Sequence, residues 1–125
     1  MPDNYAVTFD PATRRMAFAF TGTWDAATAA DWDRTFKAKV AQAQAGGPWT
    51  LLVDLTAYPP QNDAVSAMHQ GHMAHSKANG MARAAVVSPK LVTQMQMKRL
   101  ADGSGMQAAI AFVSTVAEGE KHLAA

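Results

Sequence analysis

Three histidines spaced three residues apart, His69, His72 and His75, are the side chains of this sequence that most readily suggest chemistry. Imidazole is a common zinc ligand, and residues three apart on a helix can approach one ion. At about 100° per residue, however, the three side chains fan across roughly 120° of a helix. No acidic ligand lies among them, and the apolar Val65 and Met68 share the face of His72. We therefore expect no metal site, and we interpret the three as solvated histidines on a partly buried helix face.

A hydrolytic triad is the second chemistry that the residue types allow. Asp54, His72 and Ser76 supply the groups of a Ser–His–Asp site, but the chain has no Gly-x-Ser-x-Gly turn to expose a nucleophile. Residues 102–105 place a serine between glycines, yet they lack the phosphate-loop lysine and the dinucleotide fingerprint. The absence of cysteine excludes disulfides and thiolate chemistry. We therefore predict that the protein is not an enzyme and needs no cofactor.

Strands and helices alternate along the chain and would position these residues. Residues 5–9 and 16–20 carry large apolar side chains at every second position, which predicts a β-hairpin with one buried face. The nearly continuous apolar residues 49–55 predict a central parallel strand. The order ββαβαβαβα predicts an α/β fold with a mostly parallel sheet, an N-terminal hairpin and helices packed on the sheet. The other predicted elements are helices over 25–45, 63–78, 90–101 and 115–123 and strands over 82–87 and 108–113.

Local contacts are predicted within two of the helices, the first and the last. Asp25 is the expected N-cap of the first helix. Asp33 and Lys37 fall four residues apart on its polar side, where an ion pair can form. Thr115 and Glu118 have the spacing of a capping box at the start of the last helix.

Three segments, in this order along the chain, carry a resemblance to a known family. They are residues 20–25 (FTGTWD), 51–56 (LLVDLT) and 117–123 (AEGEKHL). With them the chain resembles the STAS domain (sulfate transporter and anti-sigma factor antagonist), especially the SpoIIAA-like branch grouped with Sec14-type lipid-binding domains. The resemblance implies a single SpoIIAA-like STAS domain over residues 1–125 that is regulatory and non-enzymatic, acting through a protein partner or a small ligand. The grouping of this branch with Sec14-type lipid-binding domains implies an alternative function, that of a carrier or sensor of a lipid or other apolar ligand.

The sequence departs from this family at the start of the second helix. Anti-sigma factor antagonists carry an Asp-Ser-Ser-Gly turn there, and a kinase partner phosphorylates the serine. The corresponding residues 60–64 of this chain contain no serine, so the usual phosphorylation switch is not expected. Asp63 could imitate a permanent phosphate, or it could be an ordinary helix-start residue that accepts backbone N–H bonds.

Any ligand or partner is expected at the carboxyl ends of the parallel strands, where the crevice of an open α/β sheet lies. Each loop at that edge leads into a helix whose first N–H groups favour anionic or hydrogen-bonding groups. The same side chains could instead only cap their helices. The candidate binding residues are Thr56, Asp63, Ser88, Ser114 and Thr115.

Composition restricts the class of partner. Eleven basic and ten acidic residues give a formal net charge of +1 without a block of like charge, which disfavours nucleic acid. No segment approaches the roughly 20 apolar residues of a membrane span, and the N-terminus does not resemble a signal peptide, so we expect a cytoplasmic protein without integral membrane association. A protein, or a small apolar or anionic ligand, is the expected partner, and a homodimer is left open. Several methionines could fill core gaps or form an apolar contact surface: Met68, Met73, Met95, Met97 and Met106.

Overall fold

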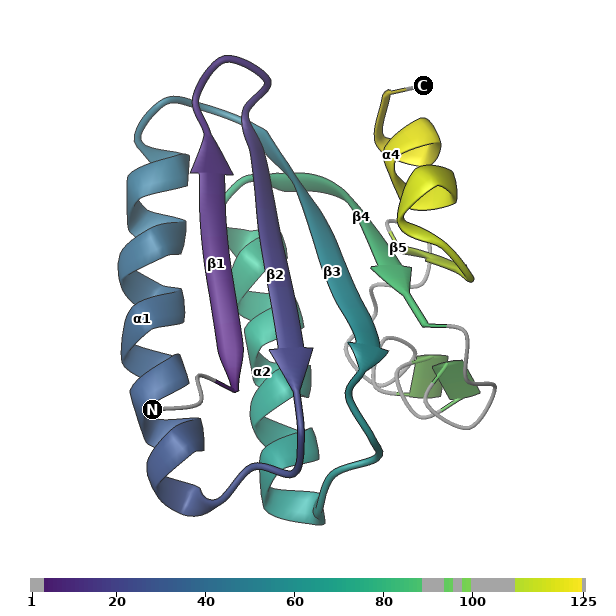
Figure 1. Cartoon of the computed structure of the whole chain (residues 1–125). Coiled ribbons are helices and arrows are strands. Elements are labelled where there is room, and N and C mark those ends of the chain that lie inside the picture. The colour runs from purple at the N-terminus through teal and green to yellow at the C-terminus, as the bar shows by residue number, and fades with distance from the viewer. Residues whose placement is uncertain (1–3, 89–93, 96–97, 100–109, 125) are drawn as a thin grey trace.

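The computed structural model of the chain describes residues 4–88, 94, 95, 98, 99 and 110–124. Five strands in this part of the chain form one sheet with the order β1-β2-β3-β4-β5 (Figure 1). β1 and β2 are antiparallel, and all other neighbouring strands are parallel. The predicted α/β fold, with its mostly parallel sheet and N-terminal hairpin, is therefore confirmed, and β3 lies at the centre as expected.

The elements follow the predicted order. They are β1 (Tyr5–Asp10), β2 (Arg15–Thr21), α1 (Ala26–Gln44), β3 (Trp49–Ala57), α2 (Asp63–Ala78), β4 (Met81–Val87), β5 (Ile110–Val113) and α4 (Val116–Ala124). The predicted helix over 90–101 lies outside the described residues except at 94, 95, 98 and 99, which are helical, and the predicted strand start at 108–109 also lies outside them. No helix in the described part of the chain is long and apolar enough to cross a membrane.

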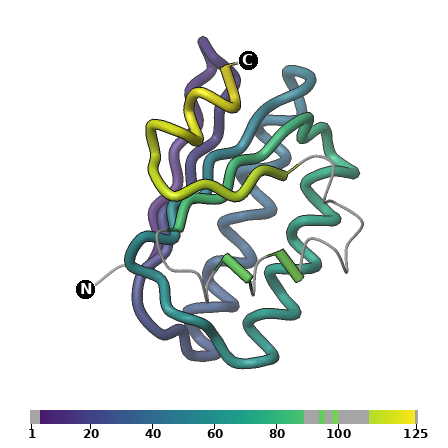
Figure 2. The backbone as a smooth tube through the Cα atoms, turned by 90° about the vertical axis from the view of Figure 1, so that its right-hand side faces the viewer, coloured from purple at the N-terminus to yellow at the C-terminus, as the bar shows by residue number. Residues whose placement is uncertain are grey.

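The sheet separates two unequal layers of helix. α1 and α2 lie against one face, whereas α4 packs on β3, β4 and β5 from the other side. Figure 2 shows the same layers from the side. Because β3 is covered on both faces, its sequence is a nearly continuous apolar run. The smaller core, under α4, contains Leu52, Ala85, Val87 and Leu123. The largest fully buried side chains of the other core are Trp24, Trp32, Trp49, Tyr58 and Phe36.

The helix α1 forms as its sequence predicts. Asp25 is the N-cap, and its Oδ1 accepts a hydrogen bond of 2.8 Å from the N–H of Thr28, which holds the pKa of this carboxyl below its usual value. The ammonium of Lys37 lies 3.0 Å from Oδ2 of Asp33, so the predicted ion pair is present. The stripe of α1 that faces the sheet consists of Trp32, Phe36, Val40 and Ala43.

The loops at the amino ends of the parallel strands are tied together by side chains. The guanidinium of Arg14 donates hydrogen bonds of 2.9 Å to the carbonyl oxygens of Gly47 and Pro48. The indole N–H of Trp49 donates to the carbonyl of Asn79 at 2.9 Å. This rim of the sheet is therefore built from internal structural contacts.

The close packing of α4 on the sheet depends on Gly119. A Cβ atom at this buried position would lie 2.7 Å from Cδ1 of Leu52, which is shorter than real carbon contacts allow. The start of the helix has the predicted capping box, because Oγ1 of Thr115 accepts from the N–H of Glu118 at 3.2 Å. The carboxylate of Glu118 accepts from the N–H of Ser114 at 3.3 Å. The capping box and the absence of a side chain at Gly119 together allow α4 to pack against β3 and β4.

Candidate functional site

The loop between β3 and α2 is fixed in place by the side chain of Gln61. Its Nε2 donates hydrogen bonds to the carbonyl oxygens of Gly22, at 3.0 Å, and Pro59, at 2.8 Å. Its Oε1 accepts a bond of 2.8 Å from the backbone N–H of Trp24. One side chain therefore satisfies three backbone groups and joins this loop to the segment between β2 and α1.

Beneath this loop, Tyr58 and His69 form a buried polar pair. The Tyr58 hydroxyl lies 2.7 Å from Nε2 of His69, and both side chains are buried. Burial raises the pKa of Tyr58 above its usual value. Burial, with a smaller contribution from His72, lowers the pKa of His69 to about 3. Both groups are therefore neutral near pH 7, and the pair anchors the loop on α2 without a buried charge.

The N-terminus of α2 is exposed above this anchor. Asn62 is its N-cap, and its side-chain oxygen accepts a hydrogen bond of 2.9 Å from the N–H of Val65. The predicted helix start at Asp63 is confirmed, and of the roles left open for Asp63 the N-cap is taken by Asn62, because Asp63 is already the first helical residue. Its exposed carboxylate lies in the first turn, where the helix dipole favours negative charge.

The other predicted binding residues lie at the same edge of the sheet but differ in exposure. Thr56 is exposed, and its Oγ1 donates a bond of 2.6 Å to Oδ1 of Asp54. Ser88 is fully buried, and its N–H donates to the carbonyl of Val113 at 2.9 Å. Ser114 and Thr115 are exposed at the start of α4. A partner can therefore reach four of the five predicted residues, whereas the Ser88 side chain lies inside the protein.

The histidines of α2 are placed differently from the prediction. His69 and His72 are buried, at 6% and 9% exposure, and His75 is half-buried, so the interpretation of all three as solvated is wrong. The His72 ring is stacked on Phe36 with ring centroids 3.9 Å apart and an interplanar angle of 14°. Its Nε2 lies 2.7 Å from Oδ1 of Asp33 in α1. His72 therefore packs as part of the core and also joins α2 to α1.

The protonation states within this contact follow from its surroundings. Burial lowers the pKa of His72, and this effect outweighs the hydrogen bond to Asp33, which acts in the opposite direction. The hydrogen bonds from His72 and Lys37 lower the pKa of Asp33. A neutral imidazole therefore donates its Nε2–H to an ionised carboxylate, which leaves Nδ1 of His72 as an acceptor.

This arrangement favours neither a metal ion nor a triad. His69 and His72 are engaged by Tyr58 and Asp33, and no group of three or more side chains able to hold a metal occurs in the described residues. Asp54 lies on the α4 side of the sheet, whereas Ser76 lines the α2 side together with His72. The three groups of the imagined Ser–His–Asp site are therefore not brought together.

Comparison with known proteins identifies the fold. No protein-family model and no curated protein matches this sequence. Among solved structures, an anti-sigma factor antagonist from Mycobacterium paratuberculosis is similar, with a TM-score of 0.63 and 17% identity over 100% of this chain and 98% of that chain. This chain has the STAS fold of the anti-sigma factor antagonists.

Two further structures with the STAS fold give the same result. The unphosphorylated form of the anti-sigma factor antagonist SpoIIAA has a TM-score of 0.58 and 16% identity, over 95% of this chain and 96% of that chain. The phosphorylated form of the Bacillus cell fate determinant SpoIIAA has a TM-score of 0.61 and 16% identity, over 94% of this chain and 99% of that chain. The resemblance predicted from the sequence is therefore confirmed for the fold.

Sequence reasoning missed Gln61 and the partner of His72. A glutamine in a proline-broken loop has no local signal for a contact with residues 37 and 39 positions earlier. The burial of α2 did have a signal, because Val65, His69, His72 and Ser76 follow the four-and-three spacing of a helical stripe. The polarity of three of these four residues concealed it.

Proposed function

We propose that this protein is a non-catalytic regulatory domain that binds a partner protein through the exposed start of α2. We call this region the α2 N-terminal surface and define it by the exposed residues Thr56, Pro60, Asn62, Asp63 and Ala64. The observation that carries the proposal is the set of three hydrogen bonds made by the Gln61 side chain, which we call the Gln61 clamp. The clamp fixes a loop that contains no catalytic arrangement, while the side chains next to Gln61 remain exposed. Similar structures with this fold are described as anti-sigma factor antagonists, which are regulators by name.

Rigidity favours binding by this loop. A surface that is already ordered loses less conformational freedom when a partner docks, so more of the contact energy appears as affinity. Gln61 orders the loop from the side of β2, and the Tyr58–His69 pair orders it from below. The opposite rim of the sheet uses Arg14 and Trp49 for internal contacts. The edge at the carboxyl ends of the parallel strands is therefore the better candidate for the binding surface of a partner protein.

Binding at this surface is proposed to be independent of a phosphorylation switch. Residues 60–64 contain no hydroxyl side chain. Ser66, the next serine, is half-buried in the first turn of α2. The fixed negative charge of Asp63 takes the place of a switchable one, at a helix end that favours anions.

Two alanines of α2 allow a matched test. Ala64 lies in the first turn and Ala78 in the last turn, and both are exposed. The wild type and the variants Ala64→Arg and Ala78→Arg would be immobilised, and proteins retained from a lysate of the source organism would be identified by mass spectrometry. We expect a partner that is retained by the wild type and Ala78→Arg and lost with Ala64→Arg. Equal retention by both variants would place the partner elsewhere.

The alternative function, a carrier or sensor of an apolar ligand, is favoured by one observation. A cavity between the sheet and the helices α1 and α2 is lined mainly by apolar side chains. It has about 50 Å³ of space open to the centre of a water molecule. Pockets for drug-sized ligands are roughly 300–1,000 Å³. This cavity therefore suits a small molecule and not a lipid chain.

A further inference from the structure

One half of the second face of the sheet is left open by α4. This helix packs on β3, β4 and β5, and in the part of the chain that the structure describes no helix lies over β1 and β2 on this side (Figure 1). Beside α4 the open half forms a groove with about 220 Å³ of space that the centre of a water molecule can reach. Neighbouring strands are about 4.8 Å apart and a helix is about 10–12 Å wide, so the open width suits one helix.

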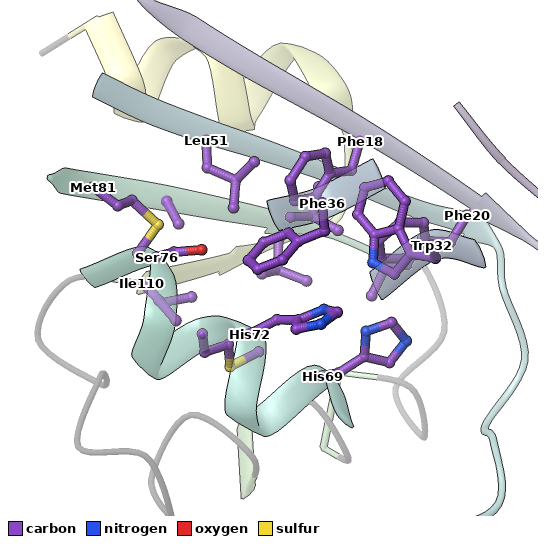
Figure 3. Close-up of a pocket in the computed structure, with 15 residues that line it drawn as sticks. Phe18, Phe20, Trp32, Phe36, Leu51, His69, His72, Ser76, Met81 and Ile110 are labelled. Carbon is purple, nitrogen blue, oxygen red and sulfur yellow. The ribbon is translucent and has the colours of Figure 1, made fainter. Parts of the chain in front are cut away.

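The floor of this groove is built from short side chains. They come from alternate positions of β1 and β2: Ala6, Thr8, Ala17 and Ala19. The intervening residues of β2 point the other way, and Phe18 and Phe20 fill the core under α1 and α2 (Figure 3). Alanine is depleted in strands, where β-branched and aromatic side chains are favoured. The short side chains let another element of structure lie close against the sheet.

The wall of the groove next to α4 carries an exposed apolar side chain and a charged pair. Val116 lines the groove and is one of two large apolar side chains that are exposed among the described residues. Nη1 of Arg15 in β2 lies 4.0 Å from the carboxylate of Glu120 in α4. Because Arg15 pairs with Asp10 of β1, the last turn of α4 lies level with the Asp10 end of the groove.

The outer face of α4 is complementary to this groove. Gly119 and Leu123 face the sheet. At about 100° per residue, the opposite side of the helix carries Ala117, Lys121 and Ala124, and all three are exposed. The two alanines suit a floor of short side chains. The ammonium of Lys121, which forms no ion pair with another described residue, suits a carboxylate at the end of the groove.

We propose that two copies of this chain form a two-fold symmetric dimer in which each α4 lies in the groove of the other copy. The two helices then lie side by side between the two sheets, and each covers the open half of the other sheet. With the symmetry axis parallel to the strands, Lys121 of one copy meets the exposed carboxylate of Asp10 of the other copy. The two Val116 side chains meet near the axis, where the two Arg15 guanidinium groups balance the two Glu120 carboxylates.

The dimer goes beyond partner binding at the α2 N-terminal surface and does not depend on it. α2 lies on the opposite face of the sheet from α4, so the dimer leaves that surface accessible. None of the measurements below involves a partner protein. Their failure would therefore leave the proposed function untouched.

The oligomeric state in solution tests the proposal. Analytical ultracentrifugation of the full chain over a wide range of concentrations should show a reversible monomer–dimer equilibrium. Ala17→Arg places a long charged side chain on the floor of the groove and should abolish the dimer. Ala38→Arg, on the exposed side of α1, is the matched control and should leave the dimer intact. A chain that stays monomeric, or a dimer that persists in a folded Ala17→Arg variant, would overturn the proposal.

Charge reversal tests the pairing at exposed positions, where folding is not at risk. Lys121→Asp and Asp10→Lys each place like charges opposite one another, so each should raise the dimer dissociation constant by about tenfold or more. The variant that combines both substitutions restores opposite charges and should recover most of the lost affinity. Equal weakening in the single and the combined variants would show that Lys121 and Asp10 do not meet, which would contradict the proposed arrangement.

Discussion

His72 of α2 donates its Nε2–H to Oδ1 of Asp33 in α1 at 2.7 Å, and this contact joins two helices that are separated by a strand in the sequence. The imidazole is buried, whereas the carboxylate is about one-third exposed and also receives the ammonium of Lys37. Asp33 thus lies at the border between core and solvent. It supplies the acceptor that the buried ring needs and remains hydrated enough to stay ionised.

Removing the Asp33 carboxylate should destabilise the protein more than removing the ammonium of its exposed partner, Lys37. In Asp33→Ala the buried Nε2–H of His72 loses its acceptor, which should lower the free energy of unfolding by about 1–3 kcal/mol. Lys37→Ala removes only the solvent-exposed ion pair with Asp33, and we expect it to lower the free energy of unfolding by at most about 0.5 kcal/mol. Urea unfolding at pH 7 measures both. In a His72→Phe background the cost of Asp33→Ala should largely disappear; a full cost there would mean that the carboxylate acts through some other contact.

Acid should destabilise the protein through His69. Its pKa is about 3 in the folded state, against about 6.5 in an unfolded chain. Because the unfolded state binds the proton more readily between these values, the stabilisation is complete above about pH 6.5 and is lost as the pH falls toward 3. Between pH 7 and pH 5 the expected loss is about 2 kcal/mol. His72, whose pKa is also lowered by burial, acts in the same direction.

Urea unfolding at pH 7 and at pH 5 measures this loss, and His69→Phe is the variant that assigns it. A phenyl ring suits the aromatic surroundings of His69, where Phe20 and Trp24 lie within ring-contact distance. The drop in stability between the two pH values should be smaller in His69→Phe than in the wild type. An unchanged drop would show that other groups are responsible.

Two glycines in helices should respond in opposite ways to the same substitution. In Gly119→Ala the new Cβ meets Leu52 at 2.7 Å, so α4 must move from the sheet, at a cost of about 1–3 kcal/mol. Gly71 of α2 faces open space, and Gly71→Ala should stabilise by about 0.5–1 kcal/mol through helix propensity. Thermal unfolding of the two variants compares them directly. A stabilised Gly119→Ala would mean that α4 is not held closely on the sheet.

Whether the sequence predicts a contact in this protein depends on how many residues separate the two partners along the chain. The cap at Asp25, the Asp33–Lys37 pair and the Thr115–Glu118 box join residues three or four apart, and their spacing alone predicts them. The bond between Asp33 and His72 spans 39 residues and forms only after α1 and α2 pack together.

The candidate site shows the same limit. The sequence predicted the start of α2 at Asp63 correctly, but asparagine and aspartate are both good N-caps, so it did not show that the cap forms at Asn62. The Gln61 clamp depends on a loop conformation that no periodic pattern encodes.

Amide chemical-shift mapping with the purified partner tests the central claim most directly. Labelled protein would be titrated with the protein retained by wild type and Ala78→Arg, and the perturbed amides would be located on the structure. We predict that they cluster at residues 56–64 and at the adjoining Gly22 and Trp24, which Gln61 ties to this loop. Perturbations gathered instead at Gly46, Gly47 and Gly80, on the opposite rim, would contradict the account.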